Sequence, residues 1–567
     1  MEPASASERS NAHLRSFRGR VRAYARRYAQ VLRVIIRFGL EAFAYELDIL
    51  PRRMRRKTDV ALTALELPER LRLALEELGS AFVKLGQSLA SRGDLIPASY
   101  VMELRKLQDH VSPVPVEAIE EVIRQELGAE IGEIFEYFDP EPRATASIGQ
   151  VHFARLKGGQ PVAVKVQRPG VAEAIETDLH ILMLHAAQAE RVFPWAAENR
   201  VRDLMQEFVR TLREELDFLN EAHNTTRLQA NLKAEPTVVV PSIVWPLTTQ
   251  RVLVQEWIEG AKPGDEEAMA RFQVDAKAAA QNLFRQMIRQ ILRDGYFHGD
   301  PHAGNVLFLG GDRLAFLDCG NAVAIDRHTR DGLVSILMAV LNDDPQEVCD
   351  FVLMLGVAGD RTDPQRLTSD IGRMMAHYKG FRNTSQISIA RALDDLLGVV
   401  LRHGVRMQPA FAAIGKSMLV TEGLCLQLDP EFDAQGVVRA EGRAVLRDRL
   451  KPARVGEEVW RFGRTLQRYA LLLPRQVSHV LARTQTGGLK LRVSHENLER
   501  PLHRLDLMVN RIVFAIVVSA IIGSSTNLLL GRTVSGSLGE YLTYGYLIVG
   551  VVLGGWLLFS ILRSGRL

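Results

Sequence analysis

Apolar and polar residues alternate along several short stretches of the chain, a pattern typical of β-strands. This alternation, or a short apolar run, predicts strands over 161–167, 237–241, 251–255 and 314–317. Elsewhere apolar residues recur at helical spacing, and we expect helices over 20–49 and 208–228. Strands and helices are therefore both expected along the chain.

The C-terminal part contains two long apolar stretches without charge, 512–530 and 541–562, joined by turn-forming residues. Each stretch is long enough to cross a hydrocarbon core of about 30 Å as a helix. We therefore predict a two-helix transmembrane hairpin over 510–565, with two buried core helices as the alternative. The spacing of Gly550 and Gly554 predicts a homodimer through this hairpin, unless these are ordinary membrane glycines.

Arginines flank the hairpin on both outer sides, at Arg504, Arg511, Arg563 and Arg566. The positive-inside rule then places both ends in the cytoplasm. The sequence thus predicts a multi-pass protein of the bacterial inner (cytoplasmic) membrane with its large N-terminal part facing the cytoplasm.

The N-terminal end is basic, with 14 Lys and Arg against 6 Asp and Glu in residues 1–60, although the whole chain of 567 residues carries only +4. It lacks the apolar core of a signal peptide. The amphipathic helix predicted over 20–49 either lies on an anionic membrane or packs on its own domain. The basic run 52–57 has no nucleic-acid motif near it, so lipid headgroups are expected there and no nucleic-acid partner.

Cysteine usage restricts the class of protein further. The three cysteines contain no Cys-x-x-Cys pair, which favours a reducing compartment and argues against a disulfide scaffold or a zinc site. At this length about two to four domains are expected.

The strongest chemical signal is His298-Gly-Asp300-Pro-His-Ala-Gly-Asn305, followed by Asp318-Cys-Gly. Protein-kinase-like enzymes use this spacing for the catalytic loop and the metal-binding Asp-x-Gly. It predicts Asp300 as the catalytic acid that orients the attacking group, and Asn305 and Asp318 as ligands of Mg²⁺ beside the phosphates of ATP or ADP. The alternative is a polar turn between a helix and a hairpin.

Upstream residues supply the rest of a nucleotide site. Lys165, on the predicted strand 161–167, matches the catalytic lysine of kinases, which reaches the phosphates. Glu256, Trp257 and Ile258 follow a strand and have the form of an adenine-binding hinge. The predicted phosphate loop comprises Ala144, Thr145, Ala146, Ser147, Ile148, Gly149 and Gln150. It has one glycine where kinases have three, so an altered phosphate geometry is expected.

With these motifs the chain resembles the UbiB-type atypical kinases, bacterial relatives of the mitochondrial coenzyme-Q accessory ATPases. Lys84-Leu-Gly-Gln87 matches the family's Lys-x-Gly-Gln motif, and Glu215-Leu-Asp217 matches its Glu-x-Asp motif. The resemblance assigns Glu221 as the catalytic partner of Lys165. It also implies that the Lys-x-Gly-Gln and Glu-x-Asp segments pack over the place where a protein substrate would dock, so Lys84, Gln87, Glu215 and Asp217 are predicted to be regulatory. Lys84 and Gln87 are predicted to face the nucleotide pocket and to restrain phosphate transfer, with a solvent-facing helix surface as the alternative.

The resemblance implies an α+β fold of the bilobal protein-kinase-like type, with an extra N-terminal helical extension, followed by the transmembrane hairpin. The predicted domains are basic helices over 1–60, the extension over 61–115, an N-lobe over 116–260, a C-lobe over 261–435, a helical linker over 436–509 and the hairpin over 510–565.

Two features shape the predicted activity. After Gly320 a helical pattern resumes near Asp326, which leaves no room for the long activation segment that presents a peptide to a kinase. Cys319 replaces the usual Phe of Asp-Phe-Gly and is expected to be a small buried filler rather than a redox sensor. ATP hydrolysis therefore fits better than protein phosphorylation.

The resemblance implies a membrane-anchored, Mg²⁺-dependent ATPase that supports isoprenoid-quinone biosynthesis. Its implied partners are prenyl-quinone intermediates or other membrane lipids, and quinone-biosynthesis enzymes. Two alternatives remain open: a true kinase that phosphorylates a protein or a small lipid, and a pseudokinase scaffold that binds nucleotide without using it.

Overall fold

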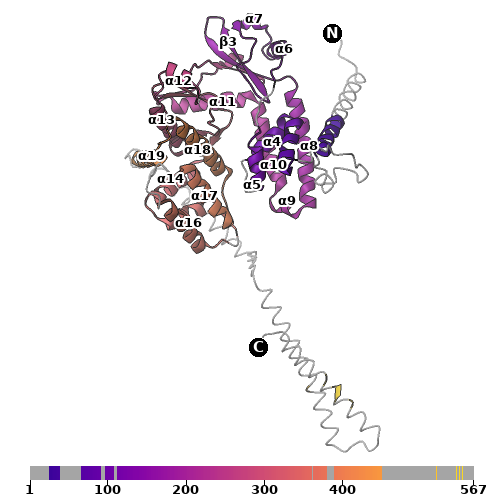
Figure 1. Ribbon diagram of the computed structural model, residues 1–567, viewed down its shortest axis with the longest axis vertical. Helices are drawn as coiled ribbons and strands as arrows, with labels where there is room; N and C mark the ends of the chain where they lie inside the picture. Colours follow the sequence, from indigo (N-terminus) through magenta and orange to yellow (C-terminus); the bar gives the residue numbers. More distant parts are fainter. Residues whose placement is uncertain are drawn as a thin grey trace, which may run out of the picture. The chain divides into compact units, whose positions relative to one another are not determined.

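The computed structural model describes residues 24–38, 65–90, 96–107, 112–359, 362–379 and 388–449, and five single positions after them: Ser519, Gly545, Ile548, Val549 and Val552. The chain divides into two units, Met1–Val455 and Gly456–Leu567. The helices and strands named below all belong to the first unit (Figure 1).

An antiparallel sheet of five strands forms the N-lobe. Its strands are β1 (Phe135–Phe138), β2 (Ala144–Thr145), β3 (Gly149–Leu156), β4 (Pro161–Gln167) and β6 (Val252–Glu256). Hydrogen bonds link them in the order β1–β3–β4–β6, with β2 paired to β3. β4 coincides with the strand predicted over 161–167, and β6 lies one residue beyond the prediction over 251–255.

The two faces of β4 have different neighbours, because successive side chains of a strand point to opposite faces. Val162, Val164 and Val166 are fully buried in a core that includes Ile119 and Ile123 of helix α6 (Val116–Leu127). Lys165 points to the other face, toward helix α11 (Phe218–Leu232). The alternating pattern of this strand thus decides which way its lysine points.

The prediction of one continuous helix over 208–228 is wrong in one respect, because two helices cover this region. Helix α10 (Val201–Leu216) ends at Asp217, and α11 begins directly after it. Asp217 has extended backbone angles (φ −102°, ψ 99°), and its carboxylate accepts a hydrogen bond from the Leu219 backbone N–H. Apolar periodicity continues through the break, whereas an N-cap acid interrupts the helix locally.

A group of helices precedes and flanks the sheet. It contains a helix over 24–37 together with α3 (Leu67–Leu78), α4 (Ser80–Ala90), α5 (Ala98–Leu104), α8 (Val171–Val192) and α9 (Pro194–Glu198). Val31, Val34 and Phe38 are buried in one core with residues of α3, α4 and α5. Arg27 forms an ion pair of 2.6 Å with Asp178 of α8. Of the two alternatives for this basic helix, the structure therefore favours packing on its own domain.

The C-lobe is mostly helical. Its helices are α12 (Glu266–Arg271), α13 (Ala276–Arg289), α14 (Arg327–Leu341), α15 (Pro345–Leu355), α16 (Pro364–Lys379), α17 (Ile389–Arg402), α18 (Pro409–Leu428) and α19 (Ala434–Arg449). Phe284 of α13 belongs to a large apolar core that also contains Phe297, Phe308 and Phe316, all fully buried.

Short strands of the C-lobe carry the predicted catalytic motifs. β7 (Tyr296–His298) pairs with β10 (Ala322–Ala324), while β8 (Val306–Gly310) and β9 (Arg313–Phe316) form a hairpin joined by β5 (Val238–Val239). The remaining short elements are α7 (Ile131–Ile134), β11 (Val357–Ala358), β12 (Val405–Arg406), the 3₁₀ turn Trp245–Leu247 and the π-helical turn Gln290–Asp294.

The C-lobe packing extends past the boundary predicted at residue 435. Helix α19 buries Val438 and Val445 in the C-lobe core. Its Glu441 forms an ion pair of 2.9 Å with Arg289 of α13, and Arg289 also pairs with Glu235 at 2.7 Å. The first part of the predicted linker 436–509 is thus structurally a helix of the C-lobe.

The predicted fold class needs a correction at the C-terminal end. Among the residues described, no helix combines the length and the apolar character that a membrane crossing requires. This finding overturns the predicted transmembrane hairpin and the multi-pass inner-membrane location inferred from it. An uncharged stretch of sufficient length is necessary for a membrane span, but it does not by itself establish one. Apart from single positions, 510–565 and the pair Gly550 and Gly554 lie outside the described residues.

Candidate active site

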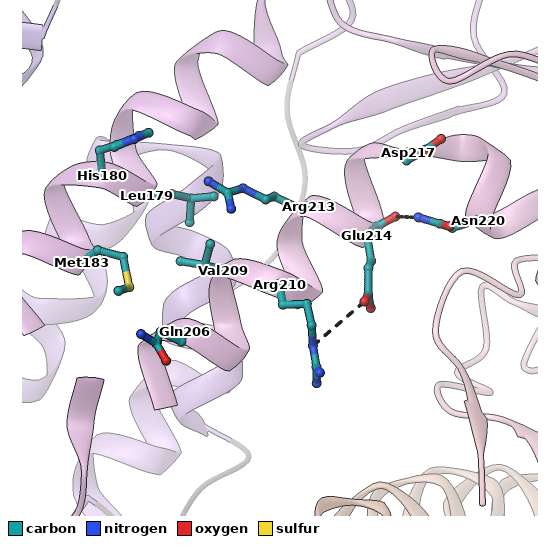
Figure 2. A pocket seen from close by; sticks show the side chains of 10 residues that line it. All are labelled: Leu179, His180, Met183, Gln206, Val209, Arg210, Arg213, Glu214, Asp217 and Asn220. Atoms are coloured by element: carbon teal, nitrogen blue, oxygen red, sulfur yellow. Dashed lines mark hydrogen bonds and ion pairs between the residues drawn. The ribbon is translucent and has the colours of Figure 1, made fainter. Parts of the chain in front are cut away.

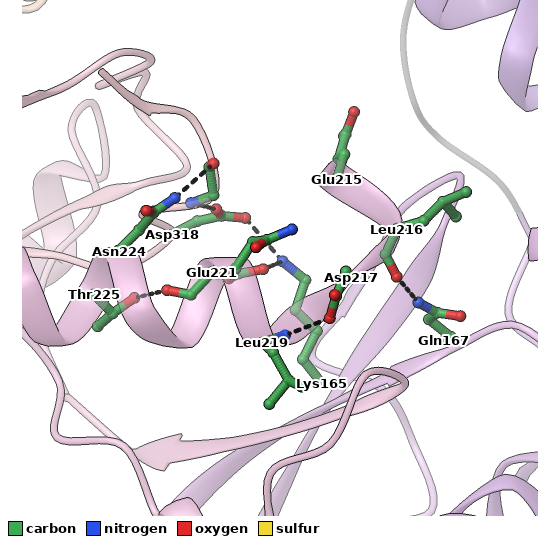
Figure 3. A network of polar contacts seen from close by, with 12 residues as sticks. Lys165, Gln167, Glu215, Leu216, Asp217, Leu219, Glu221, Asn224, Thr225 and Asp318 are labelled. Atoms are coloured by element: carbon green, nitrogen blue, oxygen red, sulfur yellow. Dashed lines mark hydrogen bonds and ion pairs between the residues drawn. The ribbon is translucent and has the colours of Figure 1, made fainter. Parts of the chain in front are cut away.

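Three charged side chains from the two lobes meet at the centre of the site (Figure 3). The Lys165 ammonium donates to Glu221 at 2.7 Å and to Asp318 at 3.0 Å. Lys165 comes from β4, Glu221 from α11, and Asp318 from the turn after β9. The pairing of Lys165 with Glu221 that the resemblance implied is therefore present in the structure.

The three side chains shift one another's pKa values and so influence which of them are charged. Burial disfavours the Lys165 ammonium, but Asp318 and Glu221 outweigh burial and raise its pKa well above the ordinary value. Partial burial opposes the Asp318 carboxylate, yet Lys165 and the Gly320 N–H hold its pKa well below the usual range. Burial and repulsion from Asp318 raise the pKa of Glu221 to about 7, against the attraction of Lys165. At neutral pH Lys165 is thus a cation and Asp318 an anion.

Hydrogen bonds at the start of helix α11 hold Glu221 in position. The Asp217 carboxylate caps the helix by accepting from the Leu219 N–H at 3.0 Å (Figure 3). One turn further on, the Thr225 hydroxyl donates to the Glu221 carbonyl at 2.7 Å. Asp217, predicted to be regulatory, therefore holds the helix that carries the partner of Lys165.

The predicted catalytic loop begins at a buried histidine. His298 is fully buried at the end of β7, and its backbone N–H donates to Gln290 Oε1 at 3.0 Å. Gln290 opens the π-helical turn, a feature frequent at functional sites. The Asp300 N–H donates to His298 Nδ1 at 3.1 Å. Burial lowers the pKa of His298 to about 4, so a neutral imidazole shapes the loop that presents Asp300.

The predicted metal ligands lie on either side of the β8–β9 hairpin. The Asn305 side-chain amide donates to the Asp300 carbonyl at 3.2 Å, and the Asn305 carbonyl accepts from the Leu317 N–H at 2.9 Å. The amide oxygen of Asn305 is the atom of this side chain that can bind a cation. The Asp318 side chain is 43% exposed, so its carboxylate is accessible.

These donors fit Mg²⁺. No cluster of three or more His, Cys, Asp or Glu side chains forms a metal site within the described ranges. However, Mg²⁺ commonly takes one or two carboxylates, with substrate phosphates and water as further ligands. Asp318 and Asn305 supply one carboxylate and one amide oxygen, which suits a metal bound together with a nucleotide.

The predicted phosphate loop turns tightly between β2 and β3. The Ala146 N–H donates to the Gly149 carbonyl at 2.8 Å, and the Arg168 side chain donates to the Ala146 carbonyl at 3.0 Å. A Cβ on Gly149 would lie 2.7 Å from the Val166 carbonyl oxygen, closer than real Cβ contacts. The single glycine of this loop is therefore required by its approach to β4.

Gln150, the last predicted residue of the loop, makes its contacts elsewhere. Its side chain is buried, accepts from the Val114 N–H at 3.0 Å and lies 2.8 Å from the His152 ring. It thus holds segment 112–115 against the sheet.

Helix α4 lies over the phosphate loop. The Ser80 hydroxyl at its start donates to the Ser147 carbonyl at 3.1 Å, and Ala81 shares a buried core with Ile148. Lys84 pairs with Glu215 at 2.5 Å, so the two family motifs meet. Gln87 donates to the Leu107 carbonyl at 3.3 Å. Lys84 and Gln87 are thereby placed on a helix whose N-terminus contacts the loop.

The predicted hinge follows β6 directly. The Glu256 N–H donates to the Ser242 carbonyl and the Trp257 N–H to the Pro161 carbonyl, at 2.9 and 3.2 Å. The Trp257 ring meets Phe153 of β3 edge-on, with the ring centres 5.0 Å apart. Glu256 and Trp257 are thus held by the sheet, and Ile258 is the next residue of the segment.

The segment after Asp318 is short, as predicted. Between Gly320 and α14, which starts at Arg327, the chain forms only β10 and a turn capped by Asp326. Cys319 is fully buried in the C-lobe core, and burial raises the pKa of its thiol. Both observations agree with the sequence: Cys319 is a buried filler, and there is no long activation segment here.

One residue of the site was missed by the sequence analysis. The Lys416 ammonium of α18 lies 3.0 Å from Asp300 Oδ2. The sequence does contain a signal for it, since Lys416 and Glu422 are the only charged residues in the twenty of α18. A charge in so apolar a helix usually has a specific partner.

A separate cavity of about 510 Å³ lies along α8 and α10, next to the start of α11 (Figure 2). Leu179, Met183 and Val209 supply apolar walls, and Arg210 pairs with Glu214 at 4.0 Å. Asp217 is part of its lining, while Lys165, Asp300 and Asp318 are not. The cavity is therefore distinct from the cluster formed by these three residues.

Comparison with family models gives three matches along the chain. Residues 106–352 match the ABC1 atypical kinase-like domain, 372–433 the UbiB helical domain, and 496–563 the ABC1/UbiB kinase-like C-terminal domain. The first match contains all the motifs described above except Lys84 and Gln87, and the second contains Lys416.

Several curated proteins are similar over most of their length. The "Probable protein kinase UbiB" of Pseudomonas entomophila is 32% identical over 76% of this chain and 82% of its own. The "Uncharacterized protein in hydrogenase 1 5'region" of Clostridium pasteurianum is 30% identical over 88% and 94%. The "Protein ACTIVITY OF BC1 COMPLEX KINASE 8, chloroplastic" of Arabidopsis thaliana is 31% identical over 84% and 68%.

Proposed function

The chain belongs to the ABC1/UbiB family of atypical kinase-like proteins, and from this premise we propose that it is a Mg²⁺-dependent ATPase. The observation that carries the proposal is the contact of Lys165 with both Glu221 and Asp318. It aligns the lysine that holds phosphates with the acid that binds the metal, an arrangement that active kinases require. A scaffold that binds nucleotide without hydrolysing it would show no ATP turnover in the experiment below.

In the proposed reaction, a water oxygen bonds to the γ-phosphorus while the bond to the β,γ-bridging oxygen breaks, and its electron pair leaves with ADP. The proton of the water passes to Asp300 or to the released phosphate. Lys165 holds the phosphates, and Glu221 holds Lys165. Asp318 and Asn305 would hold Mg²⁺, which neutralises charge on the phosphates when bound. The protein contributes positioned charge rather than a covalent intermediate.

The short segment between Gly320 and Arg327 supports water or a small molecule as the attacking group. A protein substrate needs a surface that presents its hydroxyl to Asp300, and this segment is too short to form an extended one. Phosphate transfer to a protein or small lipid remains the competing outcome of the experiment below.

Asp318→Asn tests the assignment. It keeps the shape of the side chain but removes the charge that binds Mg²⁺ and pairs with Lys165, so ATP turnover by the purified protein should fall at least about 100-fold. Asp350→Asn, on the exposed face of α15, is the matched control and should keep full turnover. Undiminished turnover in Asp318→Asn would show that the metal site is wrong. Labelled phosphate that appears on protein or lipid instead of in solution would favour the kinase.

We further propose that the ATPase serves prenyl-lipid chemistry, with isoprenoid-quinone intermediates and their biosynthetic enzymes as partners. This part depends on the resemblance to the UbiB-type proteins. Lipid extracts of a deletion strain should lack the quinone or accumulate a precursor, and the Asp318→Asn gene should fail to restore it. A normal quinone profile in the deletion strain would exclude this role.

A further inference from the structure

Helix α18 brings a positive charge to the catalytic acid. Its Lys416 ammonium lies 3.0 Å from Asp300 Oδ2, across 116 positions of sequence. The lysine side chain is 47% exposed and the Asp300 side chain 22%, so the pair borders solvent. The ammonium is therefore close to the acid and also free to shift on its flexible stem.

The backbone of α18 is well anchored around this lysine. Gln408, just before the helix, accepts a hydrogen bond from Thr329 of α14 at 3.2 Å. At the other end, the Cys425 thiol lies 3.3 Å from the Ala280 carbonyl of α13. Between them, Glu422 accepts from the Ser388 hydroxyl and from backbone N–H groups at the start of α17. These contacts hold the base of Lys416 in place without help from its own ion pair.

The two charges of α18 thus differ in what they do for the fold. Glu422 is buried and satisfies several donors, which explains its presence structurally. Lys416 makes a partly exposed ion pair, and such pairs contribute only about 0–1 kcal/mol to stability. Stability therefore gives little reason for a lysine at this position.

Phosphate chemistry gives a stronger reason. Lys165 is already shared between Glu221 and Asp318. The catalytic loop 298–305 and the segment 318–326 contain no Lys or Arg. Negative charge that spreads over the γ-phosphate oxygens in the transition state is stabilised by a preorganised cation. On the side of Asp300, the structure supplies Lys416 for this purpose.

We propose that Lys416 is a catalytic residue that shields Asp300 before ATP binds and contacts the γ-phosphate during transfer. The proposal rests on the ATPase activity proposed above. Lys416 forms and breaks no covalent bond and keeps all its protons. Its contribution is electrostatic, and it stabilises the transition state more than it stabilises bound ATP. Loss of the Lys416 charge should therefore lower kcat.

The test compares Lys416→Met and Lys416→Arg with Lys277→Met, a change of an exposed lysine on α13. Steady-state ATP turnover, ATP affinity and urea unfolding are measured on the purified chain. Lys416→Met should lower kcat about 10- to 100-fold while ATP affinity stays within about threefold and the unfolding midpoint is unchanged. Lys416→Arg keeps the charge and should recover most of kcat. Lys277→Met should match the unsubstituted protein.

The outcomes separate this proposal from the ATPase assignment. If the unsubstituted protein turns over ATP in an Asp318-dependent way but Lys416→Met is equally active, the role of Lys416 is refuted and the ATPase stands. A loss of kcat accompanied by an equal loss of stability, or one that Lys416→Arg does not relieve, also contradicts it. If the unsubstituted protein hydrolyses no ATP, the ATPase assignment itself fails.

Discussion

Single residues of the site derive their charge from their surroundings. Lys165 is kept charged by two carboxylates, and Asp318 is kept ionised by Lys165. His298 is the opposite case, because burial lowers its pKa to about 4 and leaves it neutral. Its Nδ1 can accept the Asp300 N–H only in that form.

The neutral His298 predicts a pH dependence of stability. Its pKa is about 4 in the folded chain and about 6.5 when unfolded, so the unfolded chain binds more protons between these values. The stability that it contributes is complete above pH 6.5 and is lost as the pH falls toward 4, by up to about 3 kcal/mol. Urea unfolding of His298→Gln should therefore depend less on pH over this window than unfolding of the unsubstituted protein.

His180→Gln, on the exposed face of α8, provides the control and should leave the pH dependence unchanged. Equal slopes for all three proteins would mean that His298 is not buried neutral, and that the loop before Asp300 has another support.

At the level of elements, the site depends on where helices start. The break at Asp217 turns α11 away from α10 and places Glu221 in the first turn of a new helix. The pleat of β4 points Lys165 toward α11, and the start of α11 places Glu221 within reach of it. The two side chains therefore form a hydrogen bond. We therefore expect this N-cap to affect both the stability of the fold and the candidate active site.

Asp217→Ala removes the cap. The expected cost is about 1 kcal/mol of unfolding free energy, because the Leu219 N–H loses its acceptor. ATP turnover should also fall, by about tenfold, since the first turn of α11 no longer holds Glu221 against Lys165. Urea unfolding and steady-state turnover measure the two effects.

The matched control is Asp265→Ala, which removes the equivalent cap of α12. It should cost similar stability and leave turnover intact. If the two variants behave alike in both measurements, the Asp217 cap has only a structural role.

At the scale of the whole molecule, the C-lobe extends beyond the boundary predicted at residue 435. Helix α19 completes the core behind α13, and Arg289 links Glu441 of α19 to Glu235 before β5. The helical segment that contributes Lys416 belongs to the same packed body. The candidate active site thus draws on residues from Lys84 to Lys416, over most of the described chain.

Glu441→Gln tests the extent of this body. Glu441 is buried beside Arg289 and Arg285, so the loss of its charge should reduce the unfolding free energy by about 2 kcal/mol in urea. Glu121→Gln, in an exposed pair on α6, should cause no measurable change. Equal behaviour of the two variants would indicate that the C-lobe ends before α19.

The sequence by itself determined the local features of this protein: the strand that carries Lys165, the spacing from His298 to Asp318, and the short segment after Gly320. Each of these depends on periodicity or spacing over a few residues, which a chain shows directly. The resemblance then selected Glu221 among several neighbouring acids.

Only the tertiary structure decided the rest. Lys165 meets Asp318 across 153 positions, and Lys416 meets Asp300 from a helix that shows no motif. The basic N-terminal helix, equally suited by pattern to a membrane or to its own domain, was decided by the burial of Val31 and Val34. The hydropathy of 510–565 predicted a membrane hairpin that the structure did not bear out. Such outcomes depend on which distant surfaces pack together, and no local pattern contains that information.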